Sequence, residues 1–308
     1  ILPRFQIRSK QKKSVYFLFI NGSHHVYHLI EPALRFASSY NSYESVFISG
    51  NPTNTKIIRE SHELESFKNF KFIDIPMPIR YRMKKSYKGK LYPPVYTRFD
   101  KIVSGLKNSA AIVSTSHELP RYIKKNNING PMLFYLYHGT GTRAYGFDPY
   151  LNEFDFILAP GAYHKDRLIK EKACDENKII LTGHPKFDWL NKNLNGKKSI
   201  FNNDNPTFYY NPHWEVELSS YMLWKDIIIK FFIDHTDYNL IFAPHPLVKH
   251  HSKKNKYSIE IPKDLPENII FDLDSSSLID GTYNQISDVY IGDVSSMVTE
   301  WINYRPRP

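Results

Sequence analysis

The sequence of 308 residues has one cysteine, no long apolar run and no glycine-rich phosphate loop. The single thiol, Cys174, excludes a disulfide framework and a thiolate zinc cluster, and it is typical of a reducing compartment. No stretch reaches about 18 consecutive apolar residues, so we expect no membrane-spanning segment. Residues 14–30 include polar Asn21 and three histidines, which argues against a secretory signal peptide.

Two further absences narrow the class of enzyme. The chain has neither a Walker-type loop nor a G-x-G-x-x-G motif, so neither an NTPase nor a dinucleotide enzyme is indicated. Its 13 glycines and 20 prolines are too few for a collagen-like or low-complexity chain.

The charge balance is basic, with 41 Lys and Arg against 31 Asp and Glu and a net charge of +10. A basic surface predicts an acidic partner, which leaves nucleic acid, anionic lipid head groups and a phosphorylated substrate. Composition does not choose among these three.

Short apolar runs, separated by helical patterns such as 26–38, 163–172 and 215–234, predict an α/β fold. The runs are continuous rather than alternating, which is typical of parallel strands buried on both faces. They lie at 14–20, 45–49, 72–75, 110–114, 132–137, 154–159, 179–182, 207–210, 240–243, 269–271 and 289–291.

A polar, asparagine-rich stretch at 191–205 interrupts this series and predicts an interdomain linker. We therefore expect two Rossmann-like domains, residues 1–198 and 199–308. The second domain has few strands for its type, and the chain begins at Ile1 without a methionine. Both features predict a fragment with an incomplete C-terminal domain.

Ligands of such sheets bind at the carboxyl ends of the strands, where four histidines follow predicted strands directly. These are His138, His184, His213 and His245. A histidine titrates near neutral pH, so it accepts a proton from a hydroxyl or binds a phosphate oxygen. One such histidine alone is more simply a helix cap or loop filler, but four together favour a function.

The run Asp293-Val294-Ser295-Ser296 follows the last predicted strand and opens a helix. Free N–H groups and the helix dipole at such a start favour a bound phosphate, although an ordinary N-cap has the same sequence. His24 and His28 have the spacing of one helix face, but no carboxylate completes a metal set, so we expect no metal or other cofactor.

The densest basic segment is Arg80–Lys101, in which tyrosines alternate with Lys and Arg. It fits single-stranded nucleic acid, an anionic membrane surface or simply a solvated loop. If it is functional, we favour a membrane or a polyanionic polymer over nucleic acid.

Four motifs in order make the chain similar to the CDP-glycerol glycerophosphotransferase family, which builds teichoic acids and capsule polymers. The similarity covers residues 131–301, and the earlier Gly22-Ser23-His24-His25 is similar to the opening turn of GT-B glycosyltransferases and sugar-nucleotide epimerases. The four motifs are His138-Gly139-Thr140, Gly183-His184-Pro185-Lys186-Phe187-Asp188, Pro244-His245-Pro246, and Ser287-Asp288 with Gly292-Asp293-Val294-Ser295-Ser296.

The resemblance implies a GT-B fold and a metal-independent reaction, in which an acceptor hydroxyl attacks the β-phosphate of CDP-glycerol or CDP-ribitol and CMP leaves. His138 then acts as the general base and His245 neutralises the diphosphate. Ser295 and Ser296 hold phosphate oxygens, Asp293 orients their turn, and Glu300 reaches the ribose. The remaining residues expected to bind substrate are Gly139, Thr140, Lys186, Asp188, His213 and Pro246.

The resemblance also implies a lipid-linked or polymeric acceptor, and hence a cytoplasmic enzyme on the inner face of the membrane, attached through the 80–101 segment. The chain departs from the family at Gly141, where proline is usual, and at His184, where an aromatic residue is frequent. Two alternatives remain open: a GT-B glycosyltransferase or epimerase acting on a sugar nucleotide, and a non-catalytic module that binds polyanions or membranes.

Overall fold

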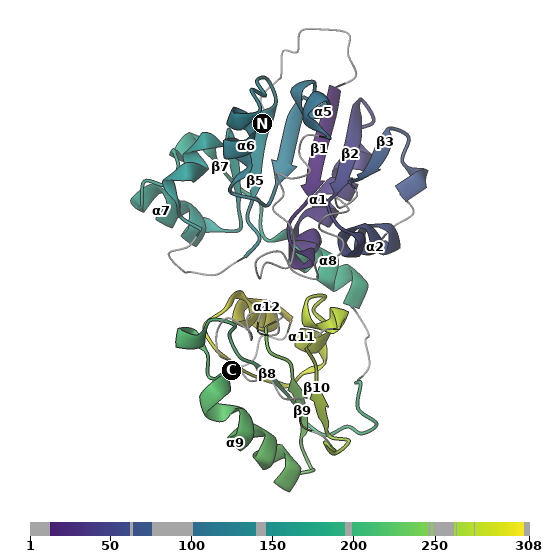
Figure 1. Ribbon diagram of the computed structural model, residues 1–308, viewed down its shortest axis with the longest axis vertical. Helices are drawn as coiled ribbons and strands as arrows, with labels where there is room; N and C mark the ends of the chain where they lie inside the picture. The colour runs from purple at the N-terminus through teal and green to yellow at the C-terminus, as the bar shows by residue number, and fades with distance from the viewer. Residues whose placement is uncertain are drawn as a thin grey trace.

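The computed structural model describes residues 13–61, 64–75, 101–139, 146–194, 199–245, 248, 262, 264–273 and 275–304. Its strands form two parallel sheets, of seven and four strands, with helices packed around them (Figure 1). This arrangement confirms the α/β prediction. The last strand of the first sheet ends at Leu181 and the first strand of the second begins at Thr207.

The first sheet has the strand order β3-β2-β1-β4-β5-β6-β7. Every apolar run predicted in this part of the chain overlaps one of its strands. The strands are β1 (Lys13–Phe19), β2 (Tyr43–Ser49), β3 (Phe70–Asp74), β4 (Ala111–Ser114), β5 (Met132–Leu136), β6 (Phe156–Ala159) and β7 (Ile179–Leu181). β1 is an inner strand and six of its seven residues are buried, because apolar clusters cover both faces of the sheet.

The second sheet has the order β10-β9-β8-β11. Its strands are β8 (Thr207–Asn211), β9 (Asn239–Phe242), β10 (Ile269–Phe271) and β11 (Val289–Gly292), again at the predicted runs. All four residues of β9 are buried, as expected for an inner strand of a parallel sheet.

Helices connect the strands as the right-handed crossovers of parallel sheets require. In the first half they are α1 (Val26–Ser39), α2 (Pro52–Ser61), α5 (Val103–Lys107), α6 (Leu119–Lys125), α7 (Ala162–Lys170) and α8 (Pro185–Leu194). In the second half they are α9 (Tyr221–Asp234), α11 (Thr282–Ile286) and α12 (Ser296–Tyr304). α8 extends into the stretch that we predicted as a linker, so that prediction is wrong for residues 191–194.

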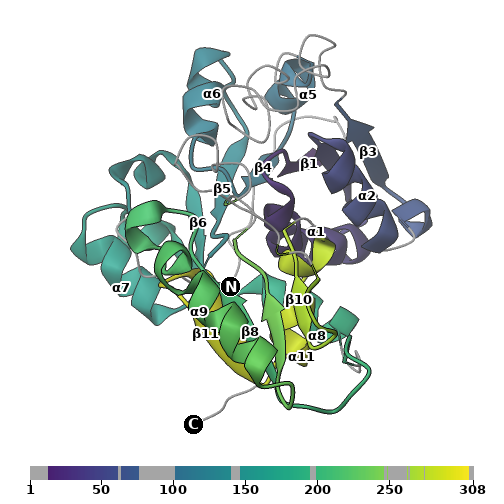
Figure 2. The ribbon, with the colours of Figure 1, turned by 60° about the horizontal axis from the view of Figure 1, so that its bottom comes forward.

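The two halves meet where α8, α11 and α12 lie between the sheets (Figures 1 and 2). α8 packs along α1 through Trp189 and Leu190, both in the apolar cluster of the first sheet. Ile279, which precedes α11, packs against that same cluster and against the core of the second sheet. An apolar contact therefore joins the halves.

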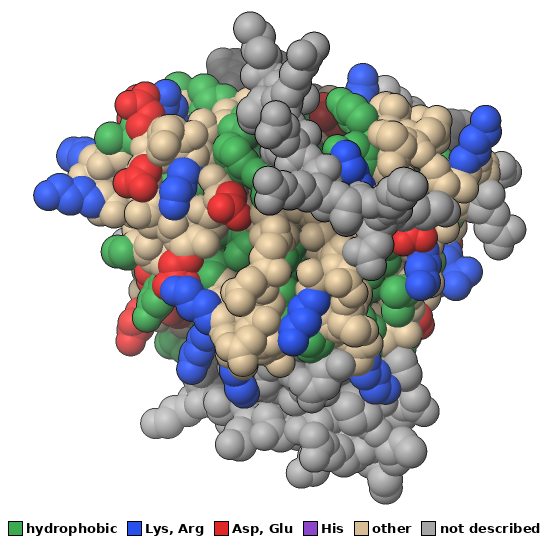
Figure 3. Space-filling model, turned by 90° about the horizontal axis from the view of Figure 1, so that it is seen from above, with side chains coloured by type: hydrophobic (Ala, Val, Ile, Leu, Met, Phe, Trp, Pro, Cys, Tyr) green, Lys and Arg blue, Asp and Glu red, His purple; other side chains and the backbone are tan. Residues whose placement is uncertain are grey.

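The opposite end of the first half is different in character. In the view from above, the described side chains at this end include apolar, basic and acidic groups, and no histidine is visible (Figure 3). Among the described helices, none combines the length and apolar character needed to cross a bilayer.

Candidate functional site

Each sheet has one point where the strand order reverses, between β1 and β4 in the first and between β8 and β11 in the second. At such a point the loops after the two neighbouring strands diverge and leave room for a ligand at the carboxyl ends. At both reversal points, polar groups form hydrogen bonds between the loops that follow the two neighbouring strands.

In the first sheet, Thr115 follows β4 and joins the loop after β1. Its Oγ1 accepts a hydrogen bond from Asn21 Nδ2 at 3.1 Å and lies 3.0 Å from His25 Nδ1. Since the Asn21 amide only donates, the hydroxyl hydrogen of Thr115 is available for His25 Nδ1. The Thr115 hydroxyl therefore joins the end of β4 to both Asn21 and His25 in the loop after β1.

His138 follows β5 and lies against His25, with ring centroids 4.0 Å apart. Its ring hydrogen-bonds to the Thr115 main chain, and Nδ1 has no partner among the described residues. Nδ1 therefore carries the lone pair. Burial, followed by the charge of His117, lowers the pKa of His138 to about 4, so the ring is neutral at pH 7 and can accept a proton.

Two further histidines lie behind this pair and are almost fully buried. His28 of α1 and His184, which precedes α8, have their rings 4.9 Å apart at a near-perpendicular angle. Burial is the main cause that lowers the pKa of each, and it lowers that of His184 to about 3. Both are therefore neutral near pH 7.

We predict that this buried cluster makes the fold sensitive to acid. His184 keeps a folded pKa of about 3 against an ordinary 6.5, so below about pH 6.5 the unfolded chain takes up a proton that the folded chain refuses. The stability that neutral, buried His184 contributes is fully present above about pH 6.5, and it is lost as the pH decreases toward 3. For His184 alone the free energy of unfolding drops by about 2 kcal/mol between pH 7 and pH 5.

Urea unfolding at pH 7, 6 and 5 measures this drop. In H184Q the free energy of unfolding should fall less between pH 7 and pH 5 than in the wild type, because glutamine takes up no proton. A wild-type curve with the same slope as H184Q would contradict the prediction.

In the second sheet, Asp293 follows β11 and bridges to the loop after β8. Its Oδ2 accepts from the main-chain N–H groups of His213 at 2.7 Å and of Ser220 at 2.9 Å. We expected Asp293 to orient the turn before α12, whereas these hydrogen bonds hold the main chain at His213 and Ser220. His213 is buried, and its Nδ1 accepts from the Glu215 N–H at 2.9 Å.

His245 follows β9 and lies beside His213, with ring centroids 6.3 Å apart. Its main-chain N–H donates to Pro212 O at 3.1 Å, which ties the loops after β8 and β9 together. Ser295 Oγ accepts from the Met297 N–H at 3.1 Å, and Ser296 begins α12. The N–H groups and the dipole at a helix start favour a bound anion, which is the role that we predicted for these two serines.

His24 connects the two sides. It lies in the 3-10 turn before α1, and its side chain is exposed, although protein surrounds it closely enough that desolvation lowers its pKa to about 3. Three further groups act on His24 through their charge: His138, His245 and Lys186. The ring of His24 lies 4.3 Å from that of His25, which contacts His138, and a charge on His245 of the second half also lowers the pKa of His24.

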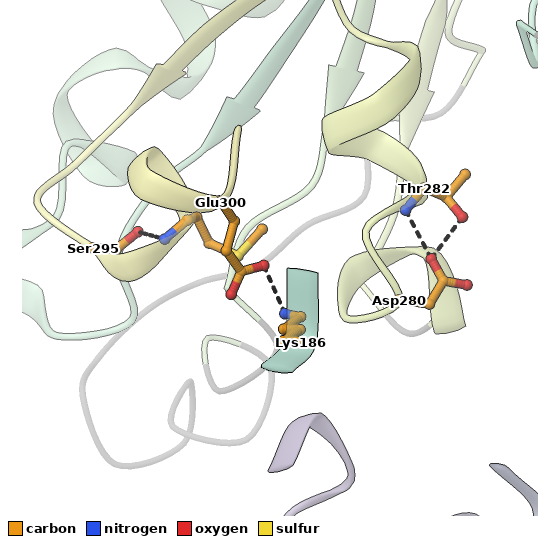
Figure 4. A network of polar contacts seen from close by, with 6 residues as sticks. Lys186, Asp280, Thr282, Ser295 and Glu300 are labelled. Carbon is orange, nitrogen blue, oxygen red and sulfur yellow. Dashed lines mark hydrogen bonds and ion pairs between the residues drawn. The ribbon is translucent and has the colours of Figure 1, made fainter. Parts of the chain in front are cut away.

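Lys186 and Glu300 form an ion pair between the halves. Lys186 Nζ donates to Glu300 Oε2 at 2.6 Å, and only 4% of either side chain is exposed (Figure 4). Glu300, expected at a ribose, is thus held by a lysine. Asp188 lies exposed in the first turn of α8, where its charge suits the helix dipole.

Gly139 is described and half-buried next to His138, whereas Thr140 and Pro246 lie outside the described residues, as does the Arg80–Lys101 segment apart from Lys101 itself. Within the part of the chain that is described, no group of three or more His, Cys, Asp or Glu side chains is arranged to hold a metal ion.

The sequence analysis missed Thr115 and His25 as members of this site. Thr115 directly follows a predicted strand, so the strand-end rule that selected the histidines would have found it. The pairing of Lys186 with Glu300 gives no local signal, because 114 positions separate them.

Comparison with known proteins shows the fold. No protein-family model matches the sequence, and no curated protein matches it. A putative UDP-N-acetylglucosamine 2-epimerase from Listeria monocytogenes is similar over 96% of this chain and 77% of that one, with a TM-score of 0.59 and 14% identity.

The UDP-GlcNAc 2-epimerase from Neisseria meningitidis bound to UDP-GlcNAc is similar over 91% of this chain and 77% of that one, with a TM-score of 0.58 and 12% identity. The wall teichoic acid polymerase TagF is similar over 94% of this chain and 67% of that one, with a TM-score of 0.54 and 16% identity. The chain therefore has the GT-B fold, and the solved structures that it resembles are enzymes.

Proposed function

We propose that this chain transfers a glycerol-phosphate or ribitol-phosphate unit from a CDP-alcohol to an acceptor hydroxyl in the synthesis of a teichoic acid or capsule-like polymer. The supporting observation is the row of rings His24, His25 and His138, with neighbouring centroids 4.3 and 4.0 Å apart, together with the effect of His245 from the second half on the pKa of His24. Transfer of a phosphoryl group requires a positioned base and neutralisation of negative charge, rather than covalent catalysis.

In the proposed reaction the acceptor oxygen attacks the β-phosphorus of the donor. A bond forms between them, the bond from that phosphorus to the bridging oxygen breaks, and the electron pair leaves with CMP. The acceptor proton passes to His138 Nδ1, which holds a lone pair because the other ring nitrogen donates to Thr115. His245 and the N–H groups at the start of α12 bind the phosphate oxygens.

A second candidate function is catalysis on a UDP-sugar, by a sugar-nucleotide epimerase or a GT-B glycosyltransferase. The observation in its favour is the structural similarity to UDP-GlcNAc 2-epimerases along nearly the whole chain. Both candidates use the same fold and the same phosphate-binding helix start, so the base of the nucleotide separates them.

Thermal unfolding with CDP-glycerol, CDP-ribitol, CMP, UDP-GlcNAc and UMP tests the proposal. A ligand at a hundred times its Kd stabilises the fold by about 2.7 kcal/mol. We expect the cytidine ligands to stabilise the wild type and H245A to lose most of this effect. H235A is the matched control, since His235 is exposed at the end of α9.

Stabilisation by uridine ligands alone would reject the CDP-alcohol in favour of the second candidate. Equal stabilisation of H245A and wild type by cytidine ligands would remove His245 from the diphosphate site.

A further inference from the structure

The pair of Lys186 and Glu300 is buried, and among the described ion pairs it alone joins the two halves. Lys186 is the second residue of α8 and Glu300 lies in α12, and Figure 4 shows the two side chains meeting between these helices. The other described ion pairs each have at least one side chain that is considerably more exposed. A pair so deeply buried pays a desolvation cost that an exposed pair avoids.

Local structure does not account for a lysine at this position. Lys186 stands in the first turn of α8, where the helix dipole disfavours a positive charge. An ammonium group also has three N–H donors, and Glu300 is its one hydrogen-bond partner among the described residues. Among the described residues, two donors of this almost fully buried cation have no acceptor, which is unfavourable unless another acceptor completes them.

Apart from Glu300, the groups on which the charge of Lys186 acts are histidines. Its charge acts on four histidines and lowers the pKa of each: His24, His25, His28 and His184. Glu300 itself lies in α12, whose start carries the positive end of the helix dipole next to Ser295 and Ser296. Apart from Glu300, the surroundings therefore favour an anion with several oxygen atoms.

We propose that Lys186 and Glu300 form an exchangeable ion pair. A diphosphate-like oxyanion binds the two remaining N–H donors of Lys186, and Glu300 is the internal anion that balances the lysine when no such ligand is present. The inference deepens the proposed function and rests on it for the identity of the anion as part of a nucleotide. The anion site itself depends only on the contacts described here.

Neutralising Glu300 separates this role from a purely structural one. In E300Q the amide oxygen still accepts from Lys186, but the competing negative charge is gone. We expect E300Q to be less stable than the wild type in chloride and to bind inorganic pyrophosphate about tenfold more tightly, by thermal unfolding and titration calorimetry at matched ionic strength. K186Q and K186Q/E300Q should lose most of the affinity for pyrophosphate.

The exposed pair of Lys230 and Asp234, with N and O 2.7 Å apart, supplies the matched control. D234N makes the same chemical change on the surface and should leave pyrophosphate binding as in the wild type. If E300Q does not fold in chloride, its refolding in pyrophosphate replaces the titration. Folding of E300Q in pyrophosphate then supports the exchange. Failure of E300Q to fold in pyrophosphate, while K186Q/E300Q folds in chloride, contradicts the exchange.

Pyrophosphate binding to E300Q that is equal to or weaker than that of the wild type would overturn the proposal, as would unchanged binding by K186Q. Pyrophosphate has neither a cytidine nor an alcohol. Failure of the chain to use CDP-glycerol would therefore reject the proposed function and leave this result standing.

Discussion

K186M is expected to lower the free energy of unfolding by about 3–5 kcal/mol. The substitution keeps most of the side-chain volume and removes the partner of Glu300, which then stays buried as an unpaired carboxylate. Such a group costs far more than the loss of one hydrogen bond, because water no longer solvates it. Urea unfolding at pH 7 measures the effect.

Two variants control this prediction. K230M breaks an exposed pair of similar geometry and should change the free energy of unfolding by less than about 1 kcal/mol. K186M/E300L removes both buried charges and should recover most of the lost stability. A K186M variant as stable as K230M would mean that the buried pair does not hold the two halves together.

H138A is expected to lower turnover of CDP-glycerol by about 10²- to 10⁴-fold, with a smaller effect on substrate affinity. The Nδ1 atom of His138 is the proton acceptor in the proposed reaction, so its removal acts on the transition state rather than on binding. H138Q should be as slow as H138A, because the amide keeps polarity but takes up no proton.

The measurement is the steady-state release of CMP with saturating acceptor, and H235A is the control for an unrelated histidine. If H138A had the turnover of H235A, His138 would not be the base. Near-wild-type unfolding of H138A would show that a loss of rate does not come from a loss of structure.

The strands were predictable because burial on both faces demands continuous apolar runs. The apolar run from Val15 to Phe19 is an example, and it forms most of β1, an inner strand of the first sheet. The carboxyl-end rule selected His138 and His245 as candidates without any knowledge of strand order, and the structure places both directly after strands.

The linker prediction failed at α8 for a local reason. Asn191, Lys192 and Asn193 are polar and read as irregular structure, but they lie at the end of a helix whose apolar residues Trp189 and Leu190 pack on α1. Tertiary packing overrode weak local propensity.

The electrostatic arrangement of the site was beyond prediction from sequence. Lys186 and Glu300 belong to different halves, and their contact depends on how α8 and α12 lie between the sheets. The same holds for Thr115, whose hydroxyl and carbonyl groups act on two histidines because β1, β4 and β5 are neighbours in the first sheet.

Release of CMP from CDP-glycerol by the wild-type chain, with a polyol-phosphate acceptor, tests the central claim most directly. The proposed function predicts CMP together with an acceptor extended by one glycerol-phosphate unit, without added metal. The proposal would be contradicted if the chain left CDP-glycerol intact but converted UDP-GlcNAc to its C2 epimer or transferred its sugar. That result would establish the second candidate.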